Sequence, residues 1–157
     1  MIFAIITAVS CTNAQDFSKE AKAGILTSVD GSKVSFAEIL STYKGKTLVI
    51  EVWASWCGDC IKAMPKLKEL QAMHPDVSYL FLSMDRAADK WKAGIEKHEL
   101  KGGQYWSEEG MKGAFAKSID LDWIPRYIIV DKSGNTVLYR AIETDFEKID
   151  ATLKSLK

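Results

Sequence analysis

Continuous apolar runs alternate with helical stripes along most of this chain. Residues 48–54 (LVIEVWA), 77–84 (VSYLFLSM) and 126–130 (RYIIV) are apolar at nearly every position, which is typical of strands buried on both faces of a sheet. Residues 60–73 instead repeat apolar side chains every three or four positions, as one face of a helix does. Strands that alternate with helices predict an α/β fold with a mixed central sheet.

Turn and capping residues mark the smaller elements. Asp30-Gly31 indicates a β-hairpin within residues 24–35, and Ser35 with Glu38 forms a capping-box pattern before a short helix. Further elements are expected in chain order: a helix around Trp91, a short strand at 104–106, a helix capped by Ser107, a turn at 131–135, a strand at 136–139, and a C-terminal helix with Thr144 and Glu147 as its capping box.

The N-terminal residues differ from the rest of the chain. Residues 2–9 are almost wholly apolar and precede small and polar residues, which is typical of a secretory signal, although no Lys or Arg comes first. Processing is expected either before Cys11, which would then carry a lipid, or before Gln15. The alternative is an N-terminal strand or tail. We therefore predict an export segment and linker at residues 1–23 and one domain at residues 24–157.

Composition narrows the classes of function. The 157 residues leave room for one domain, and 21 basic residues balance 21 acidic ones. This balance argues against a nucleic-acid binder, which usually carries a basic excess. No apolar run reaches the roughly 20 residues that cross a bilayer. Three cysteines are too few for a small disulfide-stapled scaffold.

The chemistry is expected at Cys57-Gly58-Asp59-Cys60, between a predicted strand and a predicted helix. The amino end of a helix offers unpaired N–H groups and a positive partial charge, which lower the pKa of a thiol below about 8.5. Cys57 is then the nucleophile, and Cys60 lies one turn further on. A zinc site normally needs four ligands, and no second cysteine pair is present. Redox chemistry is therefore favoured over metal binding or a purely structural pair.

Residues 49–65 (VIEVWASWCGDCIKAMP) closely resemble the thioredoxin superfamily. Its pattern is an acid, an aromatic-rich strand end, Trp-Cys-x-x-Cys and a helix proline. Here the acid is Glu51, six residues before Cys57, and the proline is Pro65, eight residues after it. Residues 123–125 (WIP) precede a core strand and match the family's Ile-cisPro segment.

The apolar N-terminus, the hairpin and the extra helix near Trp91 are similar to those of ResA/TlpA-type thioredoxins, which are membrane-associated or periplasmic reductases of bacteria. The resemblance covers about residues 24–157. It implies a thioredoxin-like fold of the α/β class, with a central mixed sheet flanked by helices, an N-terminal β-hairpin and an inserted helix. It also implies an extracytoplasmic protein of the bacterial envelope.

The resemblance assigns roles to individual residues. Cys57 would form a mixed disulfide that Cys60 resolves. Pro125 would be cis and face the cysteines, leaving the backbone of Ile124 free to bind an extended substrate segment. Glu51 would be the buried acid beneath Cys60, with a pKa raised by burial. The alternative for Glu51 is a partly exposed position paired with a lysine.

Two interpretations remain open for each residue that flanks the cysteine motif or the Ile-Pro segment. Trp56 either packs or forms part of the docking surface. Beside Gly58, Asp59 departs from the Gly-Pro dipeptide of ordinary thioredoxins; it either opposes a thiolate at the first cysteine, favouring a reductant, or faces water. Trp123 and Arg126 flank Pro125 at positions where members of the thioredoxin superfamily commonly have small residues. Arg126 either favours a thiolate or an acidic partner, or points to solvent.

We predict a protein disulfide reductase that takes electrons from a thiol donor and needs no cofactor and no metal. It is expected to be a monomer that binds no nucleic acid and reaches a membrane only through lipid on Cys11. One alternative is a binding module without turnover. Another is a peroxiredoxin-like peroxidase, which needs a threonine where residues 54–56 read Ala-Ser-Trp. His74 and His98 are expected at the surface or at helix ends, without a catalytic role.

Overall fold

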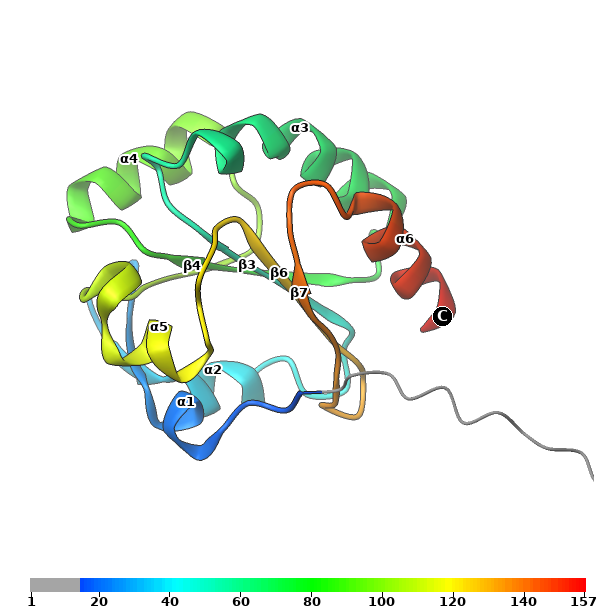
Figure 1. Cartoon of the computed structure of the whole chain (residues 1–157), viewed down its shortest axis with the longest axis horizontal. Coiled ribbons are helices and arrows are strands. Elements are labelled where there is room, and N and C mark those ends of the chain that lie inside the picture. The colour runs from blue at the N-terminus through cyan, green and yellow to red at the C-terminus, as the bar shows by residue number, and fades with distance from the viewer. Residues whose placement is uncertain (1–14) are drawn as a thin grey trace, which may run out of the picture.

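Seven strands form one mixed sheet in the computed structural model, which describes residues 15–157 (Figure 1). The order across the sheet is β2-β1-β5-β4-β3-β6-β7. Strands β3, β4 and β5 run parallel, whereas every other neighbouring pair is antiparallel. The strands are β1 (Ile25–Ser28), β2 (Lys33–Ser35), β3 (Leu48–Trp53), β4 (Ser78–Ser83), β5 (Gly103–Trp106), β6 (Arg126–Val130) and β7 (Thr136–Ala141).

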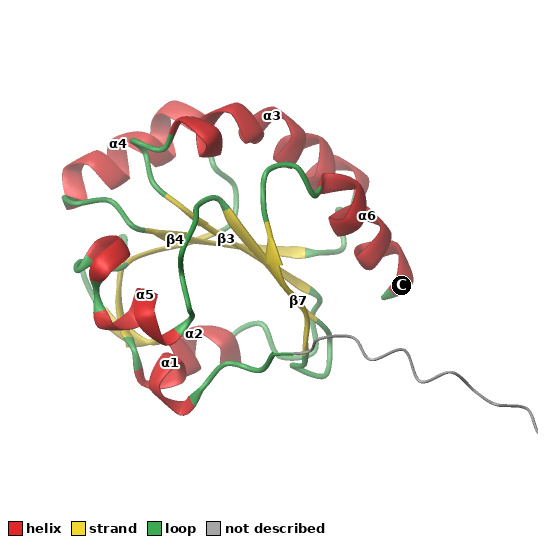
Figure 2. Cartoon of the chain, in the orientation of Figure 1, coloured by secondary structure: helices red, strands yellow, loops and turns green. Residues whose placement is uncertain are grey.

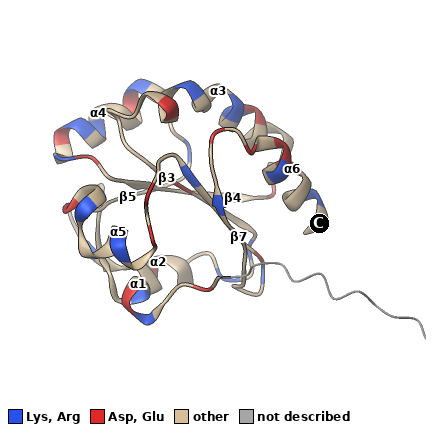
Figure 3. Ribbon diagram, viewed as in Figure 1, with Lys and Arg blue, Asp and Glu red and all other residues tan. Residues whose placement is uncertain are grey.

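Helices cover both faces of this sheet, as Figure 2 shows, with α3, α4 and α6 on one face and α1, α2 and α5 on the other. Charged residues concentrate on the helices and loops (Figure 3). The predicted α/β class with a central mixed sheet is therefore confirmed. The helices are α1 (Lys19–Ala23), α2 (Phe36–Ser41), α3 (Gly58–Met73), α4 (Ala88–His98), α5 (Ala114–Ser118) and α6 (Phe146–Ser155), with a 3₁₀ turn at Gly110–Lys112.

The N-terminal hairpin and its following helix form as the local sequence predicts. Strands β1 and β2 pair in an antiparallel register, and Gly31 in the turn has a φ of +91° that disfavours any side chain. The Ser35 hydroxyl accepts from the Glu38 backbone, and the Glu38 carboxylate accepts from the Ser35 backbone. This reciprocal capping box fixes the start of α2.

The folded unit begins earlier than the predicted boundary at residue 24. The Ser18 hydroxyl caps α1, whose Ala21 is fully buried, and Phe17 packs edge-on against Phe36. Burial of these side chains packs α1 against the folded unit, ahead of residue 24. The apolar segment at residues 2–9 and Cys11 lie outside the described residues. Within residues 15–157, no helix combines the length and apolar character needed to cross a membrane.

Two predicted helix caps are wrong. Ser107 is buried and accepts through its carbonyl oxygen from Gly110, while extended backbone at Gly113 separates the 3₁₀ turn from α5. Helix α6 begins after Asp145, not Thr144, because the Asp145 carboxylate accepts from the backbone N–H of Ile142 at 2.9 Å. In both places a loop contact displaced the local capping pattern.

Candidate active site

Three loops meet at one edge of the sheet. Strands β3 and β4 are parallel, so Cys57 and Asp85 both follow carboxyl ends at this edge. Strand β6 runs the other way and begins here, because its first residue, Arg126, pairs with Val52 near the end of β3. The residue before β6 is Pro125. The sheet topology therefore brings the cysteine motif and the Ile-Pro segment together.

Cys57 and Cys60 form a disulfide at the first turn of α3, with their Cα atoms 5.3 Å apart. Cys57 is the N-cap, and its Sγ accepts from the backbone N–H of Cys60 at 3.1 Å. Cys57 retains 6% exposure, whereas Cys60 has none, so Cys57 is the more accessible of the two sulfurs. The helix end places donors at the sulfur that would carry a thiolate. Gly58 is exposed, and a Cβ there would contact nothing.

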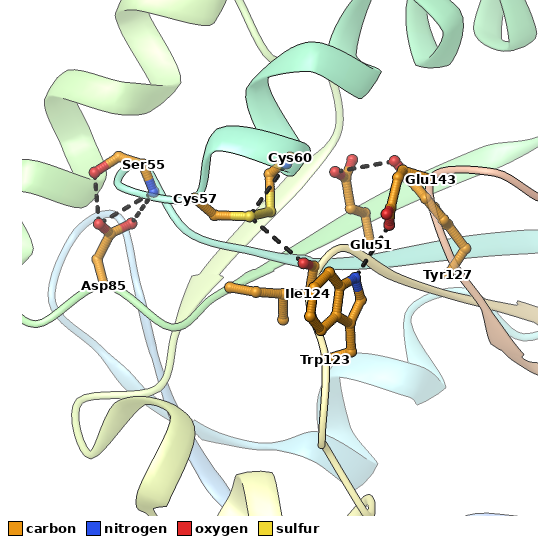
Figure 4. Close-up of a disulfide and its surroundings, with 9 residues drawn as sticks. All are labelled: Glu51, Ser55, Cys57, Cys60, Asp85, Trp123, Ile124, Tyr127 and Glu143. Atoms are coloured by element: carbon orange, nitrogen blue, oxygen red, sulfur yellow. Dashed lines mark hydrogen bonds between the residues drawn. A yellow bond between two sulfur atoms is a disulfide. The ribbon is translucent and has the colours of Figure 1, made fainter.

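The Ile124-Pro125 peptide bond is cis, as the resemblance implied. The carbonyl oxygen of Ile124 lies 3.5 Å from the Sγ of Cys57 (Figure 4). Among the described residues, no turn or loop backbone hydrogen bond involves Ile124. Its peptide groups therefore remain available to an extended chain laid beside the disulfide.

Two exposed indoles lie on the loops of the site. Trp56, directly before the motif, is 54% exposed, and Trp123, before the cis peptide, is 48% exposed. The indole N–H of Trp123 donates to the Glu143 carboxylate at 3.1 Å. The exposure of Trp56 favours a docking surface over core packing. Asp59 is half-buried in the first turn of α3, with no hydrogen bond or ion pair inside the described part of the chain.

Glu51 is buried beside the disulfide, with 2% exposure, which excludes the alternative of a partly exposed Glu (Figure 4). Burial raises its pKa from 4.5 to about 8, and a hydrogen bond from the Tyr127 hydroxyl, at 3.3 Å, opposes this rise. The expected burial and upward shift are confirmed. A carboxyl with a pKa of about 8 can take up or release a proton near neutral pH, as a general acid or base must.

Asp85 is a site residue that the sequence did not reveal. Its buried carboxylate accepts from the backbone N–H of Ser55 at 3.0 Å and from the hydroxyls of Ser55, at 2.5 Å, and Ser83, at 2.8 Å. These bonds tie the loop before Cys57 to the end of β4. The available signal was the position of Asp85, directly after a buried strand parallel to β3.

Arg126 does not face the cysteines. It alternates with Tyr127 along β6, and Tyr127 is on the face that holds Glu51. Arg126 is 1% exposed and binds the Asp122 carboxylate and, at 3.2 Å, the Asp120 carbonyl oxygen. Burial lowers the pKa of its guanidinium. The suggestions that Arg126 points to solvent or favours a thiolate are therefore wrong.

Neither histidine lies in the active site. His74 is at the carboxyl end of α3, as expected, but it is 1% exposed, with its Nε2 2.7 Å from the Asp150 carboxylate of α6. His74 is therefore a buried helix-end residue, which confirms the second of the two expected positions. His98 ends α4 and is half-buried. Across residues 15–157, no cluster of three or more His, Cys, Asp or Glu side chains is arranged to hold a metal.

Comparison with known proteins places the chain among redox proteins. The sequence profile of the Redoxin family matches residues 12–155. Thiol-disulfide oxidoreductase ResA of Bacillus thuringiensis subsp. konkukian is 24% identical over 143 residues, covering 90% of this chain and 79% of the relative.

Solved structures agree with this match. A Bacteroides vulgatus protein described as a thiol-disulfide oxidoreductase shares 30% identity and superposes with a TM-score of 0.69, over 87% of each chain. A thiol-disulfide oxidoreductase of Bacteroides fragilis shares 25% identity with a TM-score of 0.70, over 87% of this chain and 99% of its own.

Proposed function

Because this chain belongs to the Redoxin family and is a thiol–disulfide oxidoreductase with a thioredoxin-like fold, we propose that it reduces disulfide bonds in other proteins. One observation carries the proposal: the Cys57–Cys60 pair at the start of α3 lies beside both the Ile124 carbonyl and the buried Glu51 (Figure 4). This arrangement joins a nucleophile, a docking edge and a proton acceptor in one site.

The reaction proceeds by two exchanges. The Cys57 thiolate attacks one client sulfur; a Cys57–client bond forms, the client S–S bond breaks, and the released sulfur takes a proton. Cys60 then gives its proton to Glu51 and attacks the Cys57 sulfur. The Cys57–client bond breaks and the second client thiol leaves. Two electrons have passed to the client, and the Cys57–Cys60 disulfide remains.

Substrate contacts come from the neighbouring loops. An extended client segment pairs with the backbone of Ile124 beside Pro125, and the exposed Trp56 covers its apolar side chains. Gly58 and Asp59 separate the cysteines, and the Asp59 carboxylate disfavours a thiolate at Cys57. This charge favours the oxidised pair and thus a reductant.

The same proposal extends to location and partners. The apolar residues 2–9 support export to the bacterial envelope, and Cys11 supports a lipid anchor there. A thiol donor would return electrons to the cysteine pair of a monomeric protein. No metal or cofactor enters the exchange.

Insulin reduction with dithiothreitol tests this function. The wild-type protein should accelerate precipitation of the insulin B chain, and Cys57→Ser should not. Peroxide consumption without insulin reduction would indicate a peroxidase, and partner binding without either reaction would indicate a binding module. A reduction potential of about −270 mV supports a reductase. A potential of about −120 mV would indicate an oxidase.

A further inference from the structure

The two oxygens of the Glu51 carboxyl have different surroundings. Oε1 accepts from the Tyr127 hydroxyl at 3.3 Å, whereas Oε2 has no hydrogen-bond partner among residues 15–157. Both side chains are buried. Buried polar atoms are nearly always paired, so an orphaned carboxyl oxygen is an unusual feature that calls for a function.

Strand register fixes this contact. Glu51 on β3 and Tyr127 on β6 are direct partners in the antiparallel ladder, so their side chains leave the same face of the sheet. The Tyr127 ring packs edge-on against Phe146 of α6, at 5.3 Å between centroids. Tyr127 is therefore held by both its strand and its ring, and it brings its hydroxyl to one side of the carboxyl (Figure 4).

We propose that Tyr127 is a positioning residue for disulfide exchange: its hydroxyl fixes Oε1 of Glu51 and leaves Oε2 to exchange the proton of Cys60. The inference rests on the proposed function. In the resolving step, the Cys60 S–H bond breaks and its proton forms an O–H bond at Oε2. The Cys60 thiolate then displaces the client sulfur from Cys57, so that charge and electrons balance.

Among the described residues around Glu51, Tyr127 is the one that donates a hydrogen bond to its carboxyl. The partner of Glu51 on β4 is the apolar Phe81, and Figure 4 shows Cys60 of α3 near the Glu51 carboxyl. The loop before α6 contributes Glu143, which the Trp123 indole holds at 3.1 Å. Burial and the charges of Glu51 and Glu143 raise the pKa of Tyr127 well above its usual 10, so its hydroxyl stays protonated and keeps donating.

Tyr127→Phe tests the proposal, because it removes only the hydroxyl and keeps the ring. Tyr139→Phe is the matched control: Tyr139 is also buried, and its hydroxyl donates to the Ile119 carbonyl, away from Glu51. Infrared difference spectra of oxidised protein across pH follow the Glu51 carboxyl, with Glu51→Gln identifying its band. Stopped-flow measurements follow the release of a mixed disulfide with a cysteine peptide across the same pH range.

Loss of the Tyr127 bond should move the Glu51 titration upward by about 0.5–1 pH unit, the equivalent of one hydrogen bond. The pH midpoint of the resolving step should move with it, and Tyr139→Phe should move neither. In a Glu51→Gln background, Tyr127→Phe should leave the remaining pH profile unchanged.

An unshifted Glu51 band in folded Tyr127→Phe would overturn the inference, as would an equal shift in Tyr139→Phe. A shifted band with an unchanged resolving step would also overturn it, because Tyr127 would then act on Glu51 without serving exchange. Failure of the wild-type protein to resolve the mixed disulfide would instead refute the proposed function. The infrared titration needs no turnover, so the two failures are distinguishable.

Discussion

Replacement of Glu51 by glutamine should change how stability depends on pH. The folded protein holds the pKa of Glu51 at about 8, against 4.5 for the free group, because burial disfavours the charged form. The unfolded chain therefore releases this proton at lower pH than the folded chain. The free energy of unfolding of the wild-type protein should fall as pH rises from 4.5 to about 8.

The size of this effect follows from the shift. One pKa unit corresponds to about 1.4 kcal/mol, so an interval of 3.5 units corresponds to a loss on the order of 5 kcal/mol. That is a large share of the roughly 5–15 kcal/mol that stabilises a typical domain. Glu51→Gln cannot ionise and escapes the loss. Its stability relative to the wild type should be similar near pH 5 and clearly higher near pH 9.

Urea unfolding of the oxidised proteins at pH 5, 7 and 9 measures the effect, because disulfide-bonded Cys57 and Cys60 do not titrate. Glu96→Gln is the matched control, since Glu96 is exposed on α4 and should give a curve parallel to the wild type. Parallel curves for Glu51→Gln and the wild type between pH 5 and 9 would show that Glu51 ionises normally in the folded protein, and the reasoning would fail.

Two further substitutions test the supports of the site. Asp85→Asn replaces an acceptor of the Ser55 N–H and of two hydroxyls; it should lower stability by about 1–3 kcal/mol and slow insulin reduction, and unchanged activity would show that Asp85 does not position the cysteine loop. Arg126→Met removes a buried guanidinium whose Nε and Nη1 have no partner within residues 15–157, and leaves Asp122 free to hydrate at 72% exposure. Its unfolding free energy should be unchanged or higher, and a loss above about 3 kcal/mol would contradict this expectation.

The elements around the cysteines were predictable because their local patterns agree with their tertiary positions. Strand β3 is apolar at five of its six positions and is buried on both faces. Its single acid, Glu51, stood out for that reason. The change from a continuous apolar run to a helical stripe at the cysteine motif located the junction of β3 and α3.

The remaining features depend on contacts between distant segments. The Asp85 network joins residues 30 positions apart, and the bond between Tyr127 and Glu51 spans 76 positions. The local sequence around Asp85 and around Tyr127 does not show which distant residue each one contacts. The position of the Arg126 side chain was predicted wrongly because the apolar run around it does not show which residues of β6 face the disulfide. In the strand, Arg126 lies on the face opposite to Tyr127. Helix α1 was missed because its short polar sequence gains its stability from packing of Phe17 and Ala21.

Trapping of a mixed disulfide tests the central claim most directly. A client peptide with an activated disulfide should form a stable covalent adduct with Cys60→Ala, because no resolving thiol remains to release it. Cys57→Ala should form little adduct, since Cys60 is fully buried while Cys57 keeps an exposed edge. Mass spectrometry after equal reaction times measures the fraction of each variant that carries the peptide adduct. Strong preference for Cys60→Ala is the predicted result, and equal trapping by both variants would contradict Cys57 as the attacking thiol.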